Sequence, residues 1–357
     1  MSLLKTPQPA RHPAPLTKAQ RLSHLVLARR DLEAAEKFFI HFGLAVAERR
    51  PGALFLRAAD PHAYCIEVRE APNDDFIGFG LEVAGPADLD TLAALPGAER
   101  QTVWDRPGGG ACVVLTDPGG HRIEAVTGQT PVEALAVRAP LGANRPGAPE
   151  RINEGQRPAF EPPQILKLGH TVLMVSRFQE MSGWYTETFG LIPSDCDVLP
   201  DGSPAICFFR FDLGDVPADH HSIAMGQGFD DIHIHSAFEV CDLDAVGVGQ
   251  AVLHKQGYDH AWGIGRHILG SQIFDYWRDP TGDMFEHYCD GDVFTADAPL
   301  GVQAAGSDTL FQWGPPVPGD FIRPKPNLKT LKALVRNVRK SPDLSVRKLV
   351  MMARTMG

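Results

Sequence analysis

The feature that most constrains the fold of this chain is an internal repeat. The segment LKLGHTVLMVSRFQEMSGWYTETFGL (166–191) closely matches RLSHLVLARRDLEAAEKFFIHFGL (21–44). Each segment has a histidine near its start, His170 or His24, in an apolar strand pattern. An amphipathic helix pattern follows and ends at Phe-Gly-Leu. A duplicated unit of this size predicts a repeated architecture, and it places a histidine at the same strand position twice.

Each half of the chain repeats the order strand, helix, strands twice. In the first half we expect strands at 22–28, 53–59, 62–69, 77–84, 111–116 and 121–126, and helices at 31–41 and 86–94. In the second half we expect strands at 166–175, 205–211, 220–226, 232–240, 272–278 and 283–289, and helices at 177–189 and 242–256. One such unit cannot bury both faces of its strands, whereas two together can curl into an open barrel. The predicted class is α+β, with two domains that each contain two βαβββ modules in open mixed barrels.

Loss of periodicity marks the segments outside these domains. We expect an N-terminal arm at 1–20, an N-terminal domain at 21–130, a linker with seven prolines at 131–163, a C-terminal domain at 164–295 and a basic tail at 296–357. The tail carries two short basic amphipathic patterns. Two interpretations stay open for it: contact with a membrane or nucleic acid, or packing on a neighbouring subunit or as a solvated cap.

Composition excludes several classes of protein. The 357 residues carry a formal net charge of −10, which argues against general nucleic-acid binding. The sequence has no run of eighteen apolar residues, so we predict no membrane span. The proline-rich start predicts a cytoplasmic protein. The six cysteines are scattered without a Cys-x-x-Cys pair. We expect them to be reduced and buried rather than part of a disulfide framework or a zinc site.

Aligning the two halves with each other reveals a candidate metal site. Matching the shared Glu-Val of IHIHSAFEV (232–240) and FIGFGLEV (76–83) places His235 opposite Gly78. Matching the Asp-Pro-x-Gly motifs places Glu286 opposite Glu124. The second half therefore has three candidate ligands at equivalent strand positions: His170, His235 and Glu286. The first half has His24, Gly78 and Glu124 there, so we predict that it binds no metal.

Two histidines and one carboxylate are typical of the facial triad of non-haem Fe(II) oxygenases, which leaves positions open for substrate and O2. Structural zinc would close four ligands, usually including cysteine. His233 lies two residues from His235 and is an alternative ligand. Glu286 has the alternative of pairing with an arginine as a buried carboxylate. His220 is expected to point away from His221 and to be structural.

Several motifs together resemble those of the type I extradiol (ring-cleaving catechol) dioxygenases of the vicinal oxygen chelate superfamily. They are LGHTVLMV, ADHHSIAM, IHSAFEV, GIGRHILGSQIFDYWRDP and FEHYCDGD, in this order, and the resemblance covers residues 21–295. The family often has His-His at the second ligand, whereas this chain has Ile234-His235; the expected ligand is the second of the pair.

The resemblance implies a glyoxalase-like fold and a set of roles. His170, His235 and Glu286 would bind Fe2+, with Mn2+ as the alternative. His221 would be the acid–base residue, and His267 and Tyr276 would contact the substrate. The implied reaction inserts both atoms of O2 into a catechol-type diol next to its hydroxyls, in aromatic catabolism, and a homo-oligomer is expected. The sequence does not identify the catechol.

Two other functions occur on this fold. An oxygen-independent metalloenzyme of the glyoxalase or epimerase type would commonly use a fourth protein ligand. A small-molecule-binding protein would usually lack the ligand triad. His221, His267 and Tyr276 together favour the dioxygenase.

Overall fold

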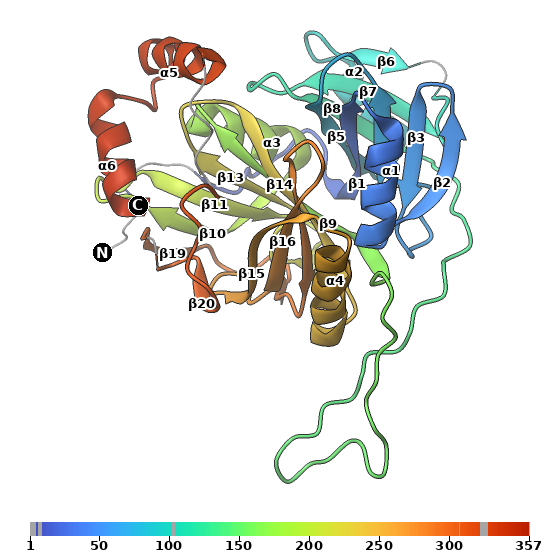
Figure 1. Cartoon of the computed structure of the whole chain (residues 1–357). Coiled ribbons are helices and arrows are strands. Elements are labelled where there is room, and N and C mark those ends of the chain that lie inside the picture. Colours follow the sequence, from blue (N-terminus) through green and yellow to red (C-terminus); the bar gives the residue numbers. More distant parts are fainter. Residues whose placement is uncertain (1–4, 6–8, 102–103, 307, 322–327, 357) are drawn as a thin grey trace.

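The computed structural model describes residues 5, 9–101, 104–306, 308–321 and 328–356. Two large mixed β-sheets dominate it, one in each half of the chain (Figure 1). The first sheet has eight strands in the order β2-β3-β4-β1-β5-β8-β7-β6. The second has ten, in the order β19-β10-β11-β13-β9-β14-β17-β16-β15-β20, and β12 and β18 form a separate pair.

The first half contains these elements: β1 (Ala19–Arg29), α1 (Leu32–Phe42), β2 (Ala45–Arg50), β3 (Ala53–Arg57), β4 (Ile66–Glu70), β5 (Asp75–Val83), α2 (Pro86–Ala93), β6 (Glu99–Gln101), β7 (Ala111–Thr116) and β8 (Arg122–Thr127). The second half contains β9 (Ile165–Val175), α3 (Phe178–Phe189), β10 (Ile192–Val198), β11 (Pro204–Arg210), β12 (Ala218–Asp219), β13 (Ile223–Gln227), β14 (Ile232–Val240), α4 (Leu243–Lys255), β15 (Asp259–His267), β16 (Ile273–Arg278) and β17 (Met284–Cys289). The last elements are β18 (Val293–Phe294), β19 (Gly301–Ala304), β20 (Phe311–Trp313), α5 (Leu328–Lys340) and α6 (Val346–Met356).

Each large sheet consists of two similar units joined through their first strands. β1 pairs antiparallel with β5, and β9 pairs antiparallel with β14. Within every unit the first strand runs parallel to the last: β1 with β4, β5 with β8, β9 with β13 and β14 with β17. The predicted four βαβββ modules in two mixed sheets are therefore confirmed. This topology brings the first and last strands of two modules together at the centre of each sheet.

The repeated Phe-Gly-Leu motif is a helix stop. α1 begins at Asp31, whose side chain accepts a hydrogen bond from the backbone N–H of Ala34. It ends at Gly43, which has φ +114°, and α3 ends in the same way at Gly190, with φ +66°. Both glycines adopt the left-handed conformation, which costs a residue without Cβ little. The motif thus turns the chain from each helix into the next strand.

The two halves share one apolar core and a buried ion-pair cluster. The guanidinium of Arg29 on β1 lies 3.0 Å from Asp279 and 2.7 Å from Asp283 of the second half. The His287 ring stacks on Phe42, and its Nε2 lies 2.7 Å from the Phe42 carbonyl oxygen. Because Arg29 and His287 are buried and make these contacts across the boundary, they fix the two halves against each other.

Besides the short strands β12, β18, β19 and β20, one strand of each module was not predicted: β2, β6, β10 and β15. Each follows a helix and lies toward the outside of its unit, where the chain is polar or interrupted, as in AVAERR and IPSDCDV. Pairing with a neighbouring strand holds them in the sheet, because their own alternation of apolar residues is weak.

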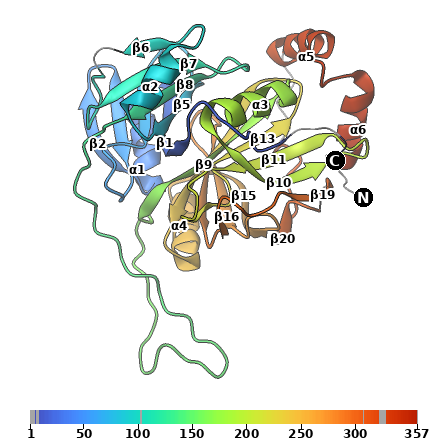
Figure 2. The ribbon, with the colours of Figure 1, turned by 180° about the vertical axis from the view of Figure 1, so that it is seen from behind.

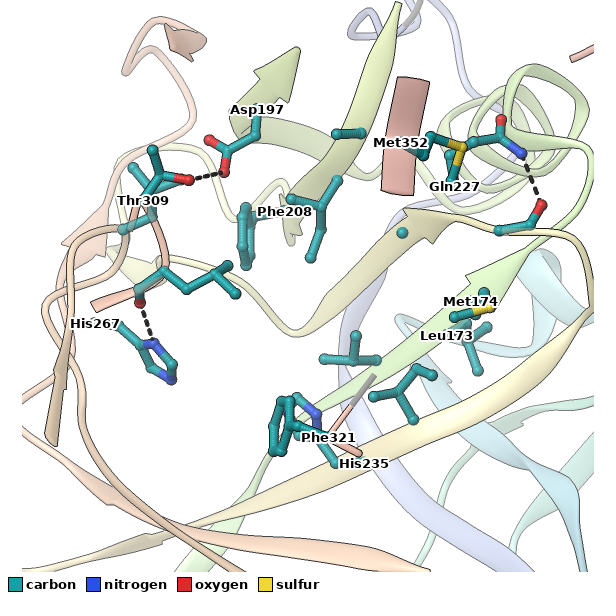
Figure 3. A pocket seen from close by; sticks show the side chains of 18 of the residues that line it. Leu173, Met174, Asp197, Phe208, Gln227, His235, His267, Thr309, Phe321 and Met352 are labelled. Atoms are coloured by element: carbon teal, nitrogen blue, oxygen red, sulfur yellow. Dashed lines mark hydrogen bonds between the residues drawn. The ribbon is translucent and has the colours of Figure 1, made fainter. Parts of the chain in front are cut away.

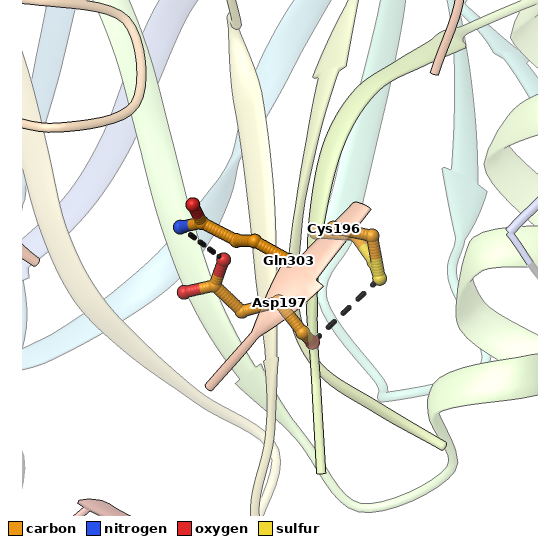
Figure 4. The surroundings of a disulfide bond; sticks show 4 residues. Cys196, Asp197 and Gln303 are labelled. Carbon is orange, nitrogen blue, oxygen red and sulfur yellow. Dashed lines mark hydrogen bonds between the residues drawn. A yellow bond between two sulfur atoms is a disulfide. The ribbon is translucent and has the colours of Figure 1, made fainter. Parts of the chain in front are cut away.

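The prediction that all cysteines are reduced is wrong for one pair. Cys196 on β10 and Cys207 on β11 form a disulfide (Figure 4). They are directly opposed in the antiparallel pairing of these strands. This pairing was not predicted, because β10 itself was not predicted from the sequence. The other four cysteines are free.

Between β8 and β9 the chain makes a long excursion away from both sheets (Figures 1 and 2). Most residues of 142–161 are exposed there. The segment before β1 instead follows the second half, where the backbone N–H groups of Leu16 and Thr17 bond to carbonyls of Glu187 and Thr188. Within the part of the chain that the structure describes, no helix is both long and apolar enough to span a membrane.

Candidate active site

Three adjacent central strands of the second sheet bring the candidate ligands together. His170 lies on β9, His235 on β14 and Glu286 on β17. Ala237 on the middle strand is paired with both His170 and Glu286, so these two side chains flank it on one face. His235, two residues before Ala237, points to the same face. The topology therefore converts three distant sequence positions into one cluster.

The donor atoms of this cluster form a nearly equilateral triangle. His170 Nε2 and His235 Nε2 are 3.3 Å apart, and each is 3.2 Å from Glu286 Oε2. Neighbouring donors of an octahedral divalent cation with bonds near 2.1 Å lie roughly 3.0 Å apart. The spacing fits one face of such a cation. It matches the two-histidine, one-carboxylate arrangement of a metal site.

Charge supports the same interpretation. Glu286 is fully buried, and within the described part of the chain its Oε1 has no hydrogen-bond partner, as is also true of Nδ1 in His170 and His235. Burial alone raises the pKa of Glu286, but hydrogen bonds from His170 and His235 outweigh it and hold that pKa well below its ordinary value. No arginine pairs with this carboxylate among the described residues. A buried carboxylate without a fixed cationic partner is costly unless a cation binds it.

His221 lies beside the cluster, before β13. Its ring centroid is 4.2 Å from that of His170, and Phe208 packs on it at 5.0 Å. Burial, followed by the neighbouring histidines, lowers the pKa of His221 well below 6.5. The expectation that His220 points away from His221 is wrong: the Nδ1 atoms of the two rings are 2.9 Å apart.

His267 and Tyr276 meet on the other side of the cluster, at the end of β15 and on β16. His267 Nε2 lies 2.9 Å from the Tyr276 hydroxyl, and His267 Nδ1 lies 2.7 Å from the carbonyl oxygen of Leu310. Burial lowers the pKa of His267 to about 4 and raises that of Tyr276 well above 10. Both groups are thus held neutral at pH 7. Tyr276 is paired with Glu286 across the strands, which keeps the hydroxyl next to the cluster.

The alternative ligand His233 lies outside the cluster. A bulge in β14 between His233 and His235 breaks the regular alternation of side chains. The His233 ring instead stacks on Phe76 at 4.1 Å, and its Nε2 lies 2.9 Å from the Ser236 hydroxyl.

The equivalent position in the first sheet holds a different set of residues. His24 Nε2 lies 2.7 Å from Glu124 Oε2, as a ligand pair would. However, the guanidinium groups of Arg122 and Arg69 reach Glu124 Oε1 at 2.6 and 3.3 Å. Two arginines of the chain itself therefore neutralise the negative charge of Glu124. Gly78 occupies the position equivalent to His235, as the register with Arg122 shows.

A cavity of about 590 Å³ opens from the ligands of the second half. Apolar side chains line most of it, including Trp262. Figure 3 shows two others, Phe208 and Phe321. Its far end is closed by three residues of α6: Leu349, Met352 and Ala353. The sequence predicted a basic amphipathic helix here but not its contact with the cavity, because only the fold brings the tail to the mouth of this barrel.

One carboxyl group lies in the otherwise apolar part of the cavity. Asp197 on β10 accepts hydrogen bonds from Gln303 at 2.8 Å and from the Thr309 hydroxyl at 3.4 Å (Figures 3 and 4). Burial raises its pKa to about 6, against the effect of these two hydrogen bonds. Sequence reasoning missed Asp197 because it is separated from the metal ligands both in the chain and in the motifs.

Comparison with known proteins agrees with this site. The model of the Glyoxalase/Bleomycin resistance protein/Dioxygenase superfamily matches residues 167–287. Metapyrocatechase 2 of Cupriavidus necator is 32% identical over 312 residues, which cover 85% of this chain and 91% of that protein. A Mn(II)-bound glyoxalase of Novosphingobium aromaticivorans has a TM-score of 0.72 at 20% identity, over 93% of this chain and 99% of the other. Homoprotocatechuate 2,3-dioxygenase of Arthrobacter globiformis also gives 0.72, at 19% identity, over 88% and 93%.

The four-module fold and the buried triad define a metalloprotein of the glyoxalase-like, or vicinal oxygen chelate, class. The likeness to the two solved structures shows this fold alone. Similarity to metapyrocatechase along most of both chains is more specific. The chain belongs to the extradiol dioxygenases, the branch of the superfamily that opens catechol-type rings.

Proposed function

We propose that this extradiol dioxygenase uses Fe(II), bound by His170, His235 and Glu286, to open a catechol next to its two hydroxyls in aromatic catabolism. The observation that carries the proposal is the triangle of donor atoms, with His221 on one side and the His267–Tyr276 pair on the other. When bound, the ion supplies a common site for the two catechol oxygens and O2, and electrons pass between them. Mn(II) is the alternative ion, since its ligand preferences overlap.

The chain's own residues supply position, proton transfer and exclusion of water. His170, His235 and Glu286 would hold the ion from one side, so that catechol and O2 could reach it from the cavity. Tyr276 and His267 form a hydrogen-bonded pair that would contact a catechol hydroxyl and help to remove its proton. His221 would take and return a proton during O–O cleavage, a step suited to imidazole. Burial of these groups keeps bulk water from the reacting ring.

The shape of the cavity supports a catechol with an apolar substituent. One ring bound at the ligands would leave the space between Phe208 and Trp262 and the α6 side chains unfilled. Because the apolar walls offer few hydrogen bonds, a substituent there would contribute to the free energy of binding mainly by burying apolar surface. We therefore propose a substrate with a hydrocarbon or second-ring substituent pointing toward Met352.

Oxygen uptake tests the proposal. Protein loaded anaerobically with Fe(II) or Mn(II) is mixed with catechols carrying substituents of increasing apolar size. We expect one O2 consumed per ring opened, with coloured product, and kcat/KM rising with the apolar substituent. Ring opening with neither ion, despite one bound ion per chain, would contradict the proposed reaction but not the metal site. It would favour an oxygen-independent metalloenzyme.

Assembly and cell location also remain predictions. We propose a homo-oligomer that acts in the cytoplasm. Sedimentation of the purified protein and fractionation of cells would test these two points separately.

A further inference from the structure

His220 connects His221 to a carboxylate outside the metal cluster. Its Nε2 lies 2.7 Å from Asp195 Oδ2, and its Nδ1 lies 2.9 Å from His221 Nδ1. The His220 side chain is fully buried, and the Asp195 side chain keeps 19% of its surface exposed. Asp195, His220 and His221 therefore form a chain of hydrogen bonds that runs from near the surface to the edge of the cavity.

The local structure is built to hold this chain. The His220 backbone N–H donates to the carbonyl of Asp292 at 2.8 Å, and the ring packs on Phe208 and Phe294. Gly301 on β19 lies opposite Asp195 on β10. A Cβ at Gly301 would come within 1.8 Å of Asp195 Oδ1. Glycine at this position thus leaves the room that the carboxylate occupies.

The hydrogen-bond pattern fixes where the protons are. An ionised carboxylate only accepts, so His220 donates its Nε2–H to Asp195. A neutral His220 then has a lone pair on Nδ1, which can only accept. His221 must therefore donate its Nδ1–H to His220, and its Nε2 is left with a lone pair. Nε2 is also the nitrogen of His221 without a hydrogen-bond partner among the described residues, next to the cavity that His221 lines.

We propose that Asp195 and His220 are positioning residues for the ring-cleavage reaction, which hold His221 in the tautomer that presents the Nε2 lone pair to bound catechol and O2. This inference rests on the proposed acid–base role of His221. With Nδ1–H engaged by His220, a proton taken from the reactants binds at Nε2 and is returned from the same atom. No net proton is gained or lost by His221 over the cycle. The arrangement resembles in logic the orienting carboxylate of a hydrolytic triad.

Two substitutions of His220 separate the two hydrogen bonds. In His220→Asn, the side-chain oxygen can reach the former Nδ1 position and accept from His221, but the contact with Asp195 is lost. In His220→Gln, the longer amide can reach Asp195, but His221 Nδ1–H has no hydrogen-bond acceptor at residue 220. We expect kcat to fall roughly 10- to 100-fold in His220→Gln and distinctly less in His220→Asn. Metal content and anaerobic binding of 4-methylcatechol should stay as in the wild type in both.

Two further variants perturb the chain without changing either histidine. Asp195→Ala removes the acceptor, and Gly301→Ala fills the room for its carboxylate. Both should lower kcat in the same direction with unchanged metal content. His260→Gln is the matched control. His260 Nε2 lies 2.7 Å from Asp275 Oδ1, which is a similar pair, and neither residue lines the cavity. It should leave kcat unchanged.

A double-mutant cycle with His221→Phe distinguishes the two levels of the proposal. If His220 acts through His221, the loss caused by His220→Gln should vanish in the His221→Phe background. Wild-type kcat in His221→Phe would overturn the acid–base role itself. A large loss in His221→Phe with wild-type kcat in His220→Gln would overturn only the positioning role. Equal losses in the Asn and Gln variants, or losses that add to that of His221→Phe, would also overturn it.

Discussion

Two buried glutamates at equivalent positions differ in their source of positive charge, and single residues decide which source it is. Glu286 faces two histidines, whereas Glu124 faces one histidine and Arg122. A histidine at Gly78 is excluded by the backbone, because a Cβ there would lie 1.8 Å from the carbonyl oxygen of Arg122. Where the second half has the candidate ligand His235, the first half has Gly78, and Arg122 supplies the positive charge beside Glu124.

Changing Glu124 should therefore affect stability and not metal content. Glu124→Gln removes the charge that His24 and Arg122 satisfy, so we expect a loss of about 2 kcal/mol in the free energy of unfolding. Bound metal should remain at one ion per chain by elemental analysis. Glu286→Gln is the comparison and should lose the ion. A fall in metal content in Glu124→Gln would contradict the assignment of a single site to the second half.

His221 should matter for turnover rather than for binding. His221→Asn retains a polar side chain but cannot exchange protons near neutral pH. We expect kcat to fall roughly 10²- to 10⁴-fold, the usual contribution of a general acid–base. Stopped-flow kinetics measure this fall, while elemental analysis should show unchanged metal content and anaerobic titration should show unchanged catechol affinity. A variant that also lost its metal would indicate that His221 is a ligand instead.

Asp197 should make stability depend on pH. Its pKa is raised to about 6 by burial, so the folded state favours the protonated form. Its contribution is fully present below the unfolded value of about 3.9 and is lost as pH rises through 6. Asp197→Asn should therefore gain about 3 kcal/mol in the free energy of unfolding relative to wild type at pH 8 and little at pH 4. Thermal unfolding at both pH values measures this, and an equal effect at both would show that Asp197 is not protonated in the fold.

Among the elements, α6 contributes most to the cavity without contributing to the sheets. Leu349 and Met352 face the cavity, while Val350 on the same helix is 46% exposed. Met352→Ala should raise KM several-fold for catechols with a large apolar substituent and leave unsubstituted catechol unaffected. Val350→Ala is the matched control. Equal effects of Met352→Ala on both substrates would show that the substituent does not reach α6.

The elements that the sequence predicted well are those whose pattern is local. Apolar periodicity predicted the strands around His170 and His235. Helix-stop residues predicted where the two helices end, at Gly43 and Gly190, and each pattern occurs in both halves of the chain. The three candidate ligands could be aligned because they lie on these strands. β10, with Asp197 and Cys196, could not be predicted, because tertiary pairing rather than alternation places it in the sheet. The contact of His220 with His221 also depends on how the chain enters β13.

At the scale of the whole molecule, the excursion between the sheets is exposed while its ends are fixed. Trypsin should cut after Arg151, which precedes the exposed Ile152, well before it cuts the sheets, because cleavage requires exposed, extended chain. The fragments should remain together, held by Arg29 with Asp279 and by the stacking of Phe42 on His287. Gel filtration and metal analysis of the nicked protein test this. Separation of the fragments under native conditions would contradict it.

The long loop also bears on how the coding sequence may be divided. All three candidate ligands follow it, and both sheets are completed without it. A stop codon followed by a start codon within this loop would create two reading frames, each encoding one sheet with its own helices. Co-expression should reassemble the enzyme from two polypeptides, since the buried contacts rather than the connecting peptide join its halves.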